Sequence, residues 1–373
     1  MSYDPKARRK TPLALKLAAP GSYMTVDQFM SDCLWDKEYG YYATRHPVGQ
    51  HGDFITAPEI SQTFGELIGL WSAVVWRDMM GAPAAHSLVE FGPGRGTLMR
   101  DMLRATAKVP GFQTDMRCQL LEWSETLKAE QQATLASCAI RPIWQRNTLD
   151  IEAPAIIIAN EFFDALPVYQ WEKSERGWTW RTVELDDNDE LQFGIHPTMR
   201  VREDLDELFP DAPLGAVVES QRPELMLDDI GAKSKLGPVA MLIVDYGQEA
   251  TALGDTLQAV RNHTHEHPLT SPGEADLSAQ VDFAAIANAA RKAGLTVDGP
   301  ITQAEFLGQL GIVERAHKLM AANPARAAEI EIGVARLMAP DSMGTRFKVL
   351  GLRSPNLPTL PGFETTAKGA QRR

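Results

Sequence analysis

The chain has 373 residues, of which 44% are hydrophobic and 8% aromatic, so it can bury a large core and is expected to form one large domain with substantial additions. Its net charge of −12 and isoelectric point near 5.2 argue against a broad surface for nucleic acid or for anionic membranes. The three cysteines lack metal-ligand spacing, and neither an apolar run of about 18 residues nor a secretory leader occurs, so the composition favours a cytoplasmic protein without disulfides, bound metal or membrane insertion.

Residues 1–85 are predicted to form a helical cap and a covering loop. A long helix with apolar periodicity is expected at 64–80, directly before the first strand of a sheet. The loop at 52–60 mixes polar with apolar side chains, and two interpretations stay open. Either the loop supplies ordinary turn and helix-cap residues, or it folds over the open edge of a pocket beside the next strand. The second interpretation makes three of its residues ligand contacts: Asp53, Pro58 and Glu59.

The stretch at 87–100 has the order strand, tight turn and helix. An apolar run ends in Glu90, and glycines follow at alternate positions, Gly92, Gly94 and Gly96. Glycine permits positive φ and the close approach of a ligand, and the free amides at a helix start suit polar ligand atoms. A dinucleotide site needs the spacing G-x-G-x-x-G, whereas G-x-G-x-G after an acid is typical of class I S-adenosylmethionine (SAM) methyltransferases. A Gly/Pro turn in an ordinary α/β protein is the alternative.

The next two strands are expected to complete the cofactor site. The strand at 116–121 ends in Glu122, and an acid at this place in a doubly wound sheet accepts hydrogen bonds from both ribose hydroxyls. The alternative makes Glu122 a surface acid. The loop after the third strand, at 140–144, commonly borders the adenine in such folds. Asn147, Thr148 and Leu149 of this loop are therefore weaker candidates to contact the adenine. The alternative is that they form a simple turn.

A buried strand at 155–159 ends in a polar segment that is expected to lie beside the transferred methyl group. Asn160 and Glu161 are candidates to bind the acceptor nitrogen or to take its proton, and Asp164 is a candidate to orient or pair. The alternative makes Glu161 and Asp164 the caps of a short helix. Asp276, much later in the chain, is a fourth candidate to approach the substrate.

From residue 168 the alternation becomes that of an antiparallel meander, and a buried strand resumes only at 238–247. We therefore predict an insertion between the fourth and fifth strands. It contains Trp171, Trp178 and Trp180. These side chains form one solvent-covered face, which we favour, or a partner surface through which a homodimer could form.

The expected fold is α/β: a class I SAM-methyltransferase (Rossmann-like) doubly wound sheet with an N-terminal helical cap and an inserted α+β segment. The chain between 254 and 282 is predicted to be loop-like. Its alternate histidines at 263, 265 and 267 lack a carboxylate or cysteine at fixed spacing, so solvent exposure is favoured over a metal site. We predict that residues 1–85 form the cap and cofactor-covering loop, that 86–353 form the methyltransferase domain, and that 354–373 form an extended tail. The methyltransferase domain is interrupted by a meander/helical insertion at 171–235 and by a helical segment at 301–340.

Five segments together resemble the MidA family of SAM-dependent methyltransferases, over roughly residues 20–352. They are Glu90-Phe-Gly-Pro-Gly-Arg-Gly-Thr-Leu98, Gly52-Asp-Phe-Ile-Thr-Ala-Pro-Glu-Ile60, Asn160-Glu-Phe-Phe-Asp-Ala-Leu-Pro167, Asp245-Tyr-Gly247 and Gly273-Glu-Ala-Asp276. The family is related to a mitochondrial complex I assembly factor that symmetrically dimethylates an arginine of a complex I subunit. The resemblance implies SAM bound at the three glycines, and arginine methylation, or a closely related protein methylation, linked to complex I. It supplies no catalytic base, and it suggests a bacterial relative acting in the cytoplasm.

Methyl transfer from a sulfonium is an in-line displacement helped by positioning and desolvation, so it requires no metal or covalent nucleophile. An arginine acceptor stays protonated, so carboxylates must pair with its planar fork and accept a proton. Glu161 is the first choice for this role, and Asp164 or Asp276 the second. Two other functions stay open: a small-molecule SAM methyltransferase with a closed pocket, and a SAM-binding assembly chaperone without turnover. The glycine spacing disfavours a NAD-linked dehydrogenase.

Overall fold

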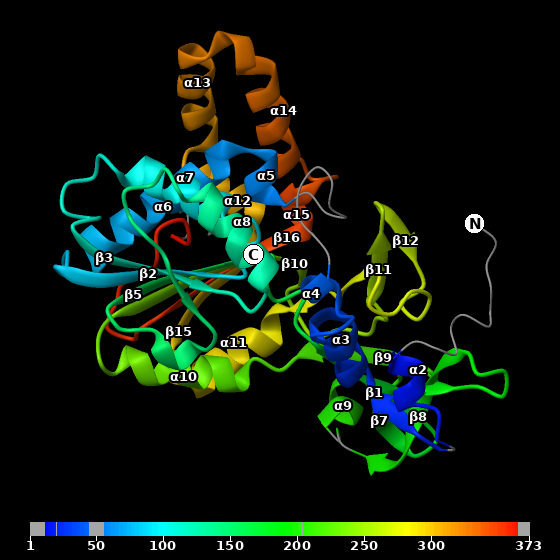
Figure 1. Ribbon diagram of the computed structural model, residues 1–373. Helices are drawn as coiled ribbons and strands as arrows, with labels where there is room; N and C mark the ends of the chain where they lie inside the picture. Colours follow the sequence, from blue (N-terminus) through cyan, green and yellow to red (C-terminus); the bar gives the residue numbers. More distant parts are fainter. Residues whose placement is uncertain (1–11, 20, 45–55, 201, 203, 365–373) are drawn as a thin grey trace.

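The computed structural model describes residues 12–19, 21–44, 56–200, 202 and 204–364. Its centre is an eight-stranded sheet (Figure 1). Along this sheet the strands are β15 (Thr296–Thr302), β16 (Phe347–Arg353), β10 (Val239–Gln248), β5 (Ala155–Asn160), β2 (Ala85–Phe91), β3 (Asp115–Leu121) and β4 (Ile143–Gln145), and the short β14 (Val281–Asp282) pairs with β10. The strands from β10 to β4 are parallel, whereas β16 runs antiparallel to both neighbours. This is the predicted doubly wound sheet.

Alternate side chains of the central strands enter two separate cores. In β5, Ile156 and Ile158 belong to one core and Ile157 and Ala159 to the other. Successive residues of a strand face opposite sides, so a strand covered on both sides is apolar throughout. The first face is covered by α6 (Gln62–Val74), its π-helical extension (Val75–Met79), α7 (Thr97–Thr106) and α12 (Gln303–Gln309). The second is covered by α10 (Glu224–Ser234) and α11 (Phe283–Lys292) (Figure 1).

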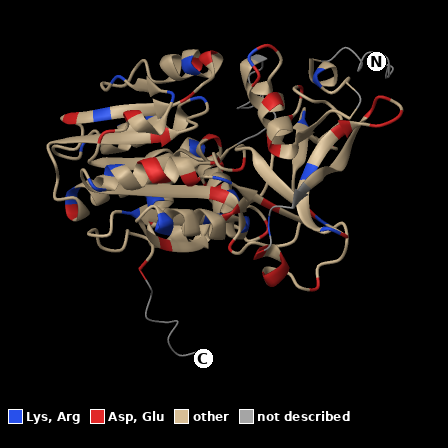
Figure 2. Ribbon diagram, turned by 90° about the horizontal axis from the view of Figure 1, so that it is seen from below, with Lys and Arg blue, Asp and Glu red and all other residues tan. Residues whose placement is uncertain are grey.

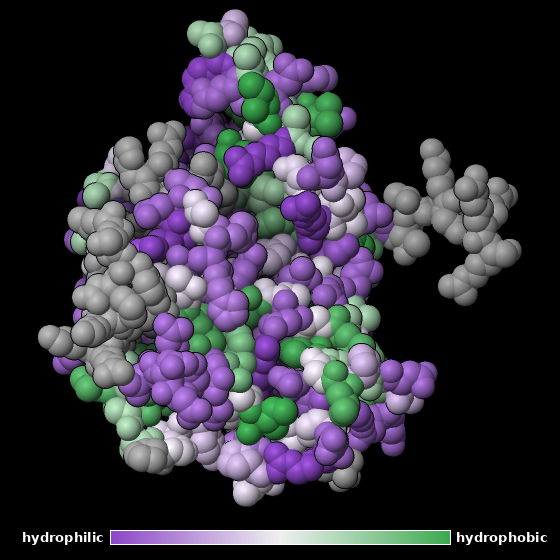
Figure 3. All heavy atoms as spheres, turned by 90° about the vertical axis from the view of Figure 1, so that its right-hand side faces the viewer, coloured by the Kyte–Doolittle hydropathy of each residue, from purple (hydrophilic) through white to green (hydrophobic). Residues whose placement is uncertain are grey.

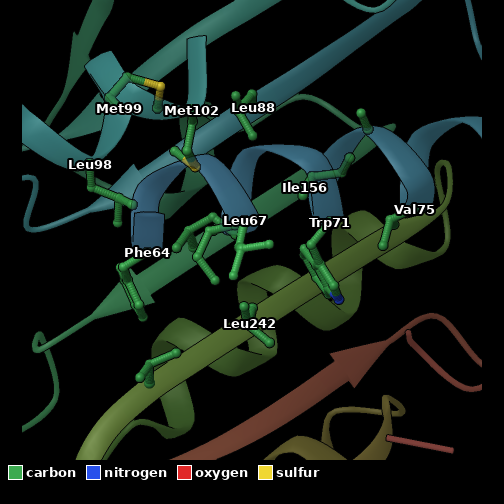
Figure 4. Close-up of a cluster of buried hydrophobic side chains, with 14 of the residues drawn as sticks. Phe64, Leu67, Trp71, Val75, Leu88, Leu98, Met99, Met102, Ile156 and Leu242 are labelled. Carbon is green, nitrogen blue, oxygen red and sulfur yellow. The ribbon is translucent and has the colours of Figure 1, made fainter. Parts of the chain in front are cut away.

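Helix α6 lies directly on the first face of the sheet. Figure 4 shows Phe64 and Trp71 of this helix beside Ile156 and Leu242 of the strands, and all four side chains are buried. Apolar burial of this kind stabilises by roughly 1.5–3 kcal/mol per large side chain. The helix therefore anchors the chain that precedes it next to the end of β2.

A second sheet stands beside the first and joins two distant parts of the chain. It consists of β1 (Tyr23–Thr25), β6 (Val168–Ser174), β7 (Gly177–Leu185), β8 (Leu191–Arg200) and β9 (Val217–Gln221). Strand β1 pairs with β7, so the N-terminal segment completes the inserted meander and is more than a separate cap. The pairing links positions that have no local sequence relation.

The predicted insertion at 171–235 is wrong at its carboxyl end. Helix α10 lies within that range, yet Leu227 and Ile230 are buried in the core of the central sheet. The parallel strands β5 and β10 are hydrogen-bonded neighbours, and a parallel connection needs a crossover that covers one face of the sheet. Helix α10 supplies this cover, so the second sheet ends with β9.

The inserted tryptophans do not form a solvent-covered face or a partner surface as a group. Trp171 and Trp178 are 2% and 0% exposed and pack with Leu205 and Val218 in a small core of their own. Leu205 comes from α9 (Asp204–Leu208), which lies over this sheet. Large aromatic side chains compensate here for the small size of the core.

The C-terminal third contains the predicted helical segment, but it departs from the prediction in the tail and near residue 260. Helices α13 (Ile312–Ala322) and α14 (Ala327–Met338) form a hairpin that projects from the body, and α15 (Met343–Arg346) leads into β16, all within or just after the predicted helical segment (Figure 1). The described part of the tail, up to residue 364, is packed: Leu357 and Leu360 are buried, and Trp71 Nε1 donates a hydrogen bond to the Pro361 carbonyl at 2.9 Å. The expected loop near residue 260 contains a small sheet of β11 (Gln258–Arg261), β12 (Thr264–Glu266) and β13 (Asp276–Ser278).

The surface is mixed in charge and in polarity. Figure 2 shows basic and acidic residues interspersed over both sheets, and in Figure 3 apolar side chains lie in small groups among hydrophilic ones on the face that carries the inserted sheet. Among the described residues, no helix combines the length and the apolar character that a membrane crossing requires.

Candidate active site

A pocket opens at the carboxyl ends of β2, β3 and β5. It holds about 780 Å³ of space that protein atoms do not fill, part of it open to solvent. Several described residues of the N-terminal region line it: Trp35 at the end of α3 (Val26–Trp35), Tyr42 in α4 (Tyr41–Thr44), and Thr56, Pro58 and Glu59 at α5 (Ala57–Ile60). The other walls come from the glycine turn, the end of β3 and the end of β5. In open parallel sheets ligands bind at this edge.

The glycine turn has the backbone geometry that its sequence predicts. Gly92, Gly94 and Gly96 have φ values of 58°, 51° and 82°, which L side chains rarely adopt. Gly92 and Gly94 line the pocket, whereas Gly96 supports the turn from behind, against α8 (Glu125–Thr134). Before the turn, Glu90 is 3% exposed, and burial raises its pKa to about 8.

Replacing Gly92 with alanine is expected to raise the dissociation constant for SAM at least about tenfold. A Cβ at this position would lie 2.8 Å from Phe162 Cδ2, and the positive φ strains any L residue. Calorimetric titration of the purified variant measures the effect. Gly294→Ala is the matched control, because Gly294 has a similarly positive φ of 85°, lies outside the pocket, and leaves open space of 4 Å around the position that a Cβ would take. A Kd for Gly92→Ala within about twofold of the parent would contradict the assignment.

Glu122 lies at the end of β3, and both of its carboxylate oxygens accept hydrogen bonds. Oε1 accepts hydrogen bonds from the backbone N–H groups of Trp123 and Ser124, each at 2.8 Å, and Oε2 accepts one from Gln131 Nε2 at 3.0 Å. Burial raises its pKa, and these donors counteract the shift. The residue lines the pocket, and its role as a ribose acceptor stays a prediction.

The short helix α5 connects the glycine turn with the end of β5. Glu59 Oε1 accepts a hydrogen bond from Thr97 Oγ1 at 2.6 Å, and the N–H of Ala57 donates to Glu161 Oε1 at 2.8 Å. Pro58 and Glu59 both line the pocket, as the covering-loop interpretation predicts. Asp53, the third candidate of this loop, lies outside the described residues.

Asn160 and Glu161 line the pocket at the end of β5. Asn160 Nδ2 donates to Glu161 Oε1 at 3.1 Å, so Oε1 holds two donors, and no described residue is hydrogen-bonded to Oε2. Glu161 is half-buried, and desolvation raises its pKa to about 7. Its φ of 50° is unusual for a residue other than glycine and turns the chain sharply out of the strand.

Asp245 fixes the segment that follows this turn. It is fully buried in the carboxyl-terminal half of β10, and its Oδ2 accepts hydrogen bonds from the consecutive N–H groups of Phe162, Phe163 and Asp164 at 3.2, 2.9 and 3.2 Å. Asp245 Oδ1 accepts a fourth from the N–H of Tyr246. One carboxylate therefore determines the path of the chain directly after Glu161.

The other two predicted carboxylates do not line the pocket. Asp164 is half-buried beside it, and desolvation raises its pKa to about 7. Asp276 is 7% exposed, and both of its oxygens accept from the Tyr42 hydroxyl, at 3.1 and 3.2 Å. Asp276 is thus connected to the site through Tyr42, which lines the pocket.

The loop after β4 is not brought to the pocket. Thr148 is buried, and its hydroxyl donates to Asp229 in α10, while Leu149 is 62% exposed and Asn147 is exposed. None of the three lines the pocket. The expectation that they border the adenine is therefore not supported, because their side chains meet α10 or solvent.

Three aromatic residues of the pocket are absent from the predicted site. Trp35 stacks on Tyr42 with ring centroids 4.6 Å apart, and Trp123 meets Trp35 edge-on at 6.0 Å. The aromatic content of residues 39–42 is a visible signal in the sequence, but periodicity assigns Trp35 to an ordinary helix end. Their meeting depends on α3 and α4 folding back over β3.

A model of the family described as "Putative S-adenosyl-L-methionine-dependent methyltransferase" matches residues 67–301, more than half of the chain. The chain belongs to this family. The resemblance to MidA-type methyltransferases, drawn from the motifs, is confirmed by this match and by the similar proteins that follow.

This methyltransferase is similar along most of its length to named relatives. "Protein arginine methyltransferase NDUFAF7, mitochondrial" from Danio rerio is 33% identical over 90% of this chain and 84% of its own length. The protein of the same name from Homo sapiens is 33% identical over 91% and 82%. A crystal structure from Burkholderia thailandensis, bound to S-adenosyl-homocysteine, has 26% identity and a TM-score of 0.84 over 99% of both chains. The class I fold is thereby confirmed.

SAM is the cofactor of this methyltransferase, as the family and the bacterial structure indicate. The pocket fits it. Glu90 Oε2 and Asn160 Oδ1 are buried without a hydrogen-bond partner among the described residues, and SAM offers amino and hydroxyl donors. The amides at the start of α7 suit a carboxylate. When bound, SAM supplies a methyl group on a positively charged sulfur.

Proposed function

We propose that this methyltransferase transfers methyl groups to an arginine side chain of a protein, with symmetric dimethylation of a respiratory complex I subunit and support of complex assembly as its role. One observation carries the proposal. Glu161 stands in the cofactor pocket with Oε1 held by Ala57 and Asn160, and with Oε2 not hydrogen-bonded to any described residue. A carboxylate fixed in this way is suited to pair with a guanidinium.

The chemistry of an arginine acceptor explains why such a carboxylate is needed. A guanidinium is protonated at neutral pH and has no free lone pair to attack a methyl group. In the proposed reaction Glu161 pairs with the guanidinium, localises the lone pair on the acceptor nitrogen, and takes the proton as the new bond forms. Asp164 adds negative charge nearby, and Asn160 orients Glu161. Asp276 has an indirect role, because it holds Tyr42 in the pocket wall.

The roles at the cofactor are part of the same proposal. Gly92, Gly94 and Gly96 shape the turn, Glu90 and Glu122 accept hydrogen bonds from SAM, and Pro58 and Glu59 close the pocket from α5. The arginine specificity is supported by the names of the relatives and by the carboxylate at the methyl-transfer edge. The link to complex I rests on the MidA resemblance, and action in the cytoplasm and a homodimer are expectations from the sequence.

The test uses SAM with an isotopically labelled methyl group, purified protein and purified complex I subunits. Arginine-containing peptides from the labelled subunit are then compared with the same peptides carrying lysine in place of arginine. Fragmentation in the mass spectrometer separates symmetric from asymmetric dimethylarginine. Label confined to arginine, and lost in the lysine peptides, supports the proposal.

Two results would contradict it. Label in a small molecule, with none in protein, indicates the small-molecule methyltransferase. Saturable SAM binding without methyl transfer to any subunit indicates an assembly chaperone.

A further inference from the structure

One side chain behind the pocket contacts the glycine turn, the end of β3 and the neighbouring strand β4. Gln131 of α8 is fully buried, and its Nε2 donates hydrogen bonds to the Gly94 carbonyl at 2.7 Å and to Glu122 Oε2 at 3.0 Å. Its Oε1 accepts a hydrogen bond from Trp144 Nε1 in β4 at 2.7 Å. Gln131 thus lies between the glycine turn, the end of β3 and β4, without lining the pocket itself.

The chemistry of the three partners determines the orientation of this amide. An indole N–H can only donate, and a backbone carbonyl can only accept. If the amide were turned over, its NH₂ group would face the Trp144 N–H and its oxygen would face the Gly94 carbonyl. Only one orientation therefore makes all three bonds, and Trp144 and the Gly94 carbonyl both select it.

The bond to Gly94 acts on the least constrained part of the pocket. Glycines with positive φ impose little stiffness of their own, because they have many accessible conformations. Glu122 is tied through Oε1 to its own loop, so Oε2 is the oxygen that links it to α8. Both residues line the pocket, and Gln131 connects them directly.

We propose that Gln131 is a positioning residue for SAM binding: it holds the glycine turn and the Glu122 carboxylate at a fixed separation and so sets the affinity for SAM. The role does not depend on the acceptor that receives the methyl group. It rests on SAM as the cofactor alone.

The test replaces Gln131 with methionine, which has a similar length and makes none of the three bonds. We expect calorimetry to give a Kd for SAM about tenfold to a hundredfold higher, in keeping with the loss of hydrogen bonds to a charged group and to a carbonyl. In turnover assays KM for SAM should rise far more than kcat falls.

Gln113→Met is the matched control. Gln113 also bridges by its amide, donating to the Leu103 carbonyl at 2.7 Å and to Thr106 Oγ1 at 2.8 Å, at the end of α7 away from the pocket. It should lower the melting temperature while leaving the Kd for SAM within about twofold. If Gln131→Met also stays within twofold, or if both variants weaken SAM binding equally, Gln131 is merely structural and the proposal is overturned.

A second variant keeps the test decisive if Gln131→Met does not fold. Trp144→Phe retains a large ring in a half-buried site and removes only the N–H that donates to Gln131 Oε1. We expect a threefold to tenfold higher Kd for SAM. The double variant should bind no more weakly than Gln131→Met, since both changes act on one bond network. An unchanged Kd in Trp144→Phe, or full additivity, overturns the proposal.

Discussion

Glu161→Gln is expected to lower kcat by about 10²–10⁴-fold, the range for loss of a general base, while the Kd for SAM stays within about threefold. Glutamine keeps the size of the side chain, and its amide oxygen can still accept from Ala57 and Asn160. It cannot take a proton from the acceptor nitrogen. The measurements are methyl transfer to the proposed arginine substrate and calorimetry with SAM. A turnover within about twofold of the parent would rule out Glu161 as the base.

Glu122→Gln is the matched control, since it should show the opposite pattern. Glu122 is also a pocket carboxylate, but its bonds connect it to the cofactor side of the pocket. Its substitution should raise the Kd for SAM more than it lowers kcat. If the two variants behave alike, the pocket does not separate cofactor binding from proton transfer as proposed.

The pH dependence of the parent gives an independent measurement on Glu161. Desolvation raises the pKa values of Glu161 and Asp164 to about 7 each. A base must be ionised, so kcat should be low below about pH 6, rise as the pH increases through about 7, and level off above it. Because the two carboxyls titrate in the same range, the inflection belongs to the pair. In Glu161→Gln the residual activity should lose most of this rise.

Asp245→Ala is expected to lower the free energy of unfolding by at least about 1–3 kcal/mol, the cost of leaving a buried hydrogen-bond donor without an acceptor. The N–H groups of Phe162, Phe163 and Asp164 would lose their acceptor. Turnover should fall as well, at temperatures where the variant is folded, because Glu161 precedes this segment. Urea denaturation and kcat below the melting transition measure the two effects.

The control for Asp245 is a buried aspartate far from the pocket. Asp298 Oδ2 accepts hydrogen bonds from Arg353 Nε at 2.8 Å and from the N–H of Leu360 at 3.0 Å, at the opposite edge of the sheet. Asp298→Ala should destabilise the protein with kcat preserved in the folded state. If Asp245→Ala lowers stability without affecting kcat, Asp245 does not position Glu161.

Local sequence patterns determined the central sheet and the cofactor turn. The apolar run of β5 predicts a strand covered on both faces, and the spacing of Gly92, Gly94 and Gly96 predicts a turn with positive φ. Asp282 caps α11, as its place before a helical segment suggests. These features are readable because each depends on neighbouring residues and on the period of a strand or helix.

Only the tertiary structure decided which distant groups complete the site. Ala57 donates to a residue 104 positions away, and Asp245 binds N–H groups 81 to 83 positions away. Strand order brings these groups together, and no local period encodes it. The same reason explains why Asn147 and Leu149 remain outside the pocket while Tyr42 enters it. The sequence alone thus determined the class of cofactor and the strand ends that bind it, whereas packing between remote segments determined the geometry of Glu161.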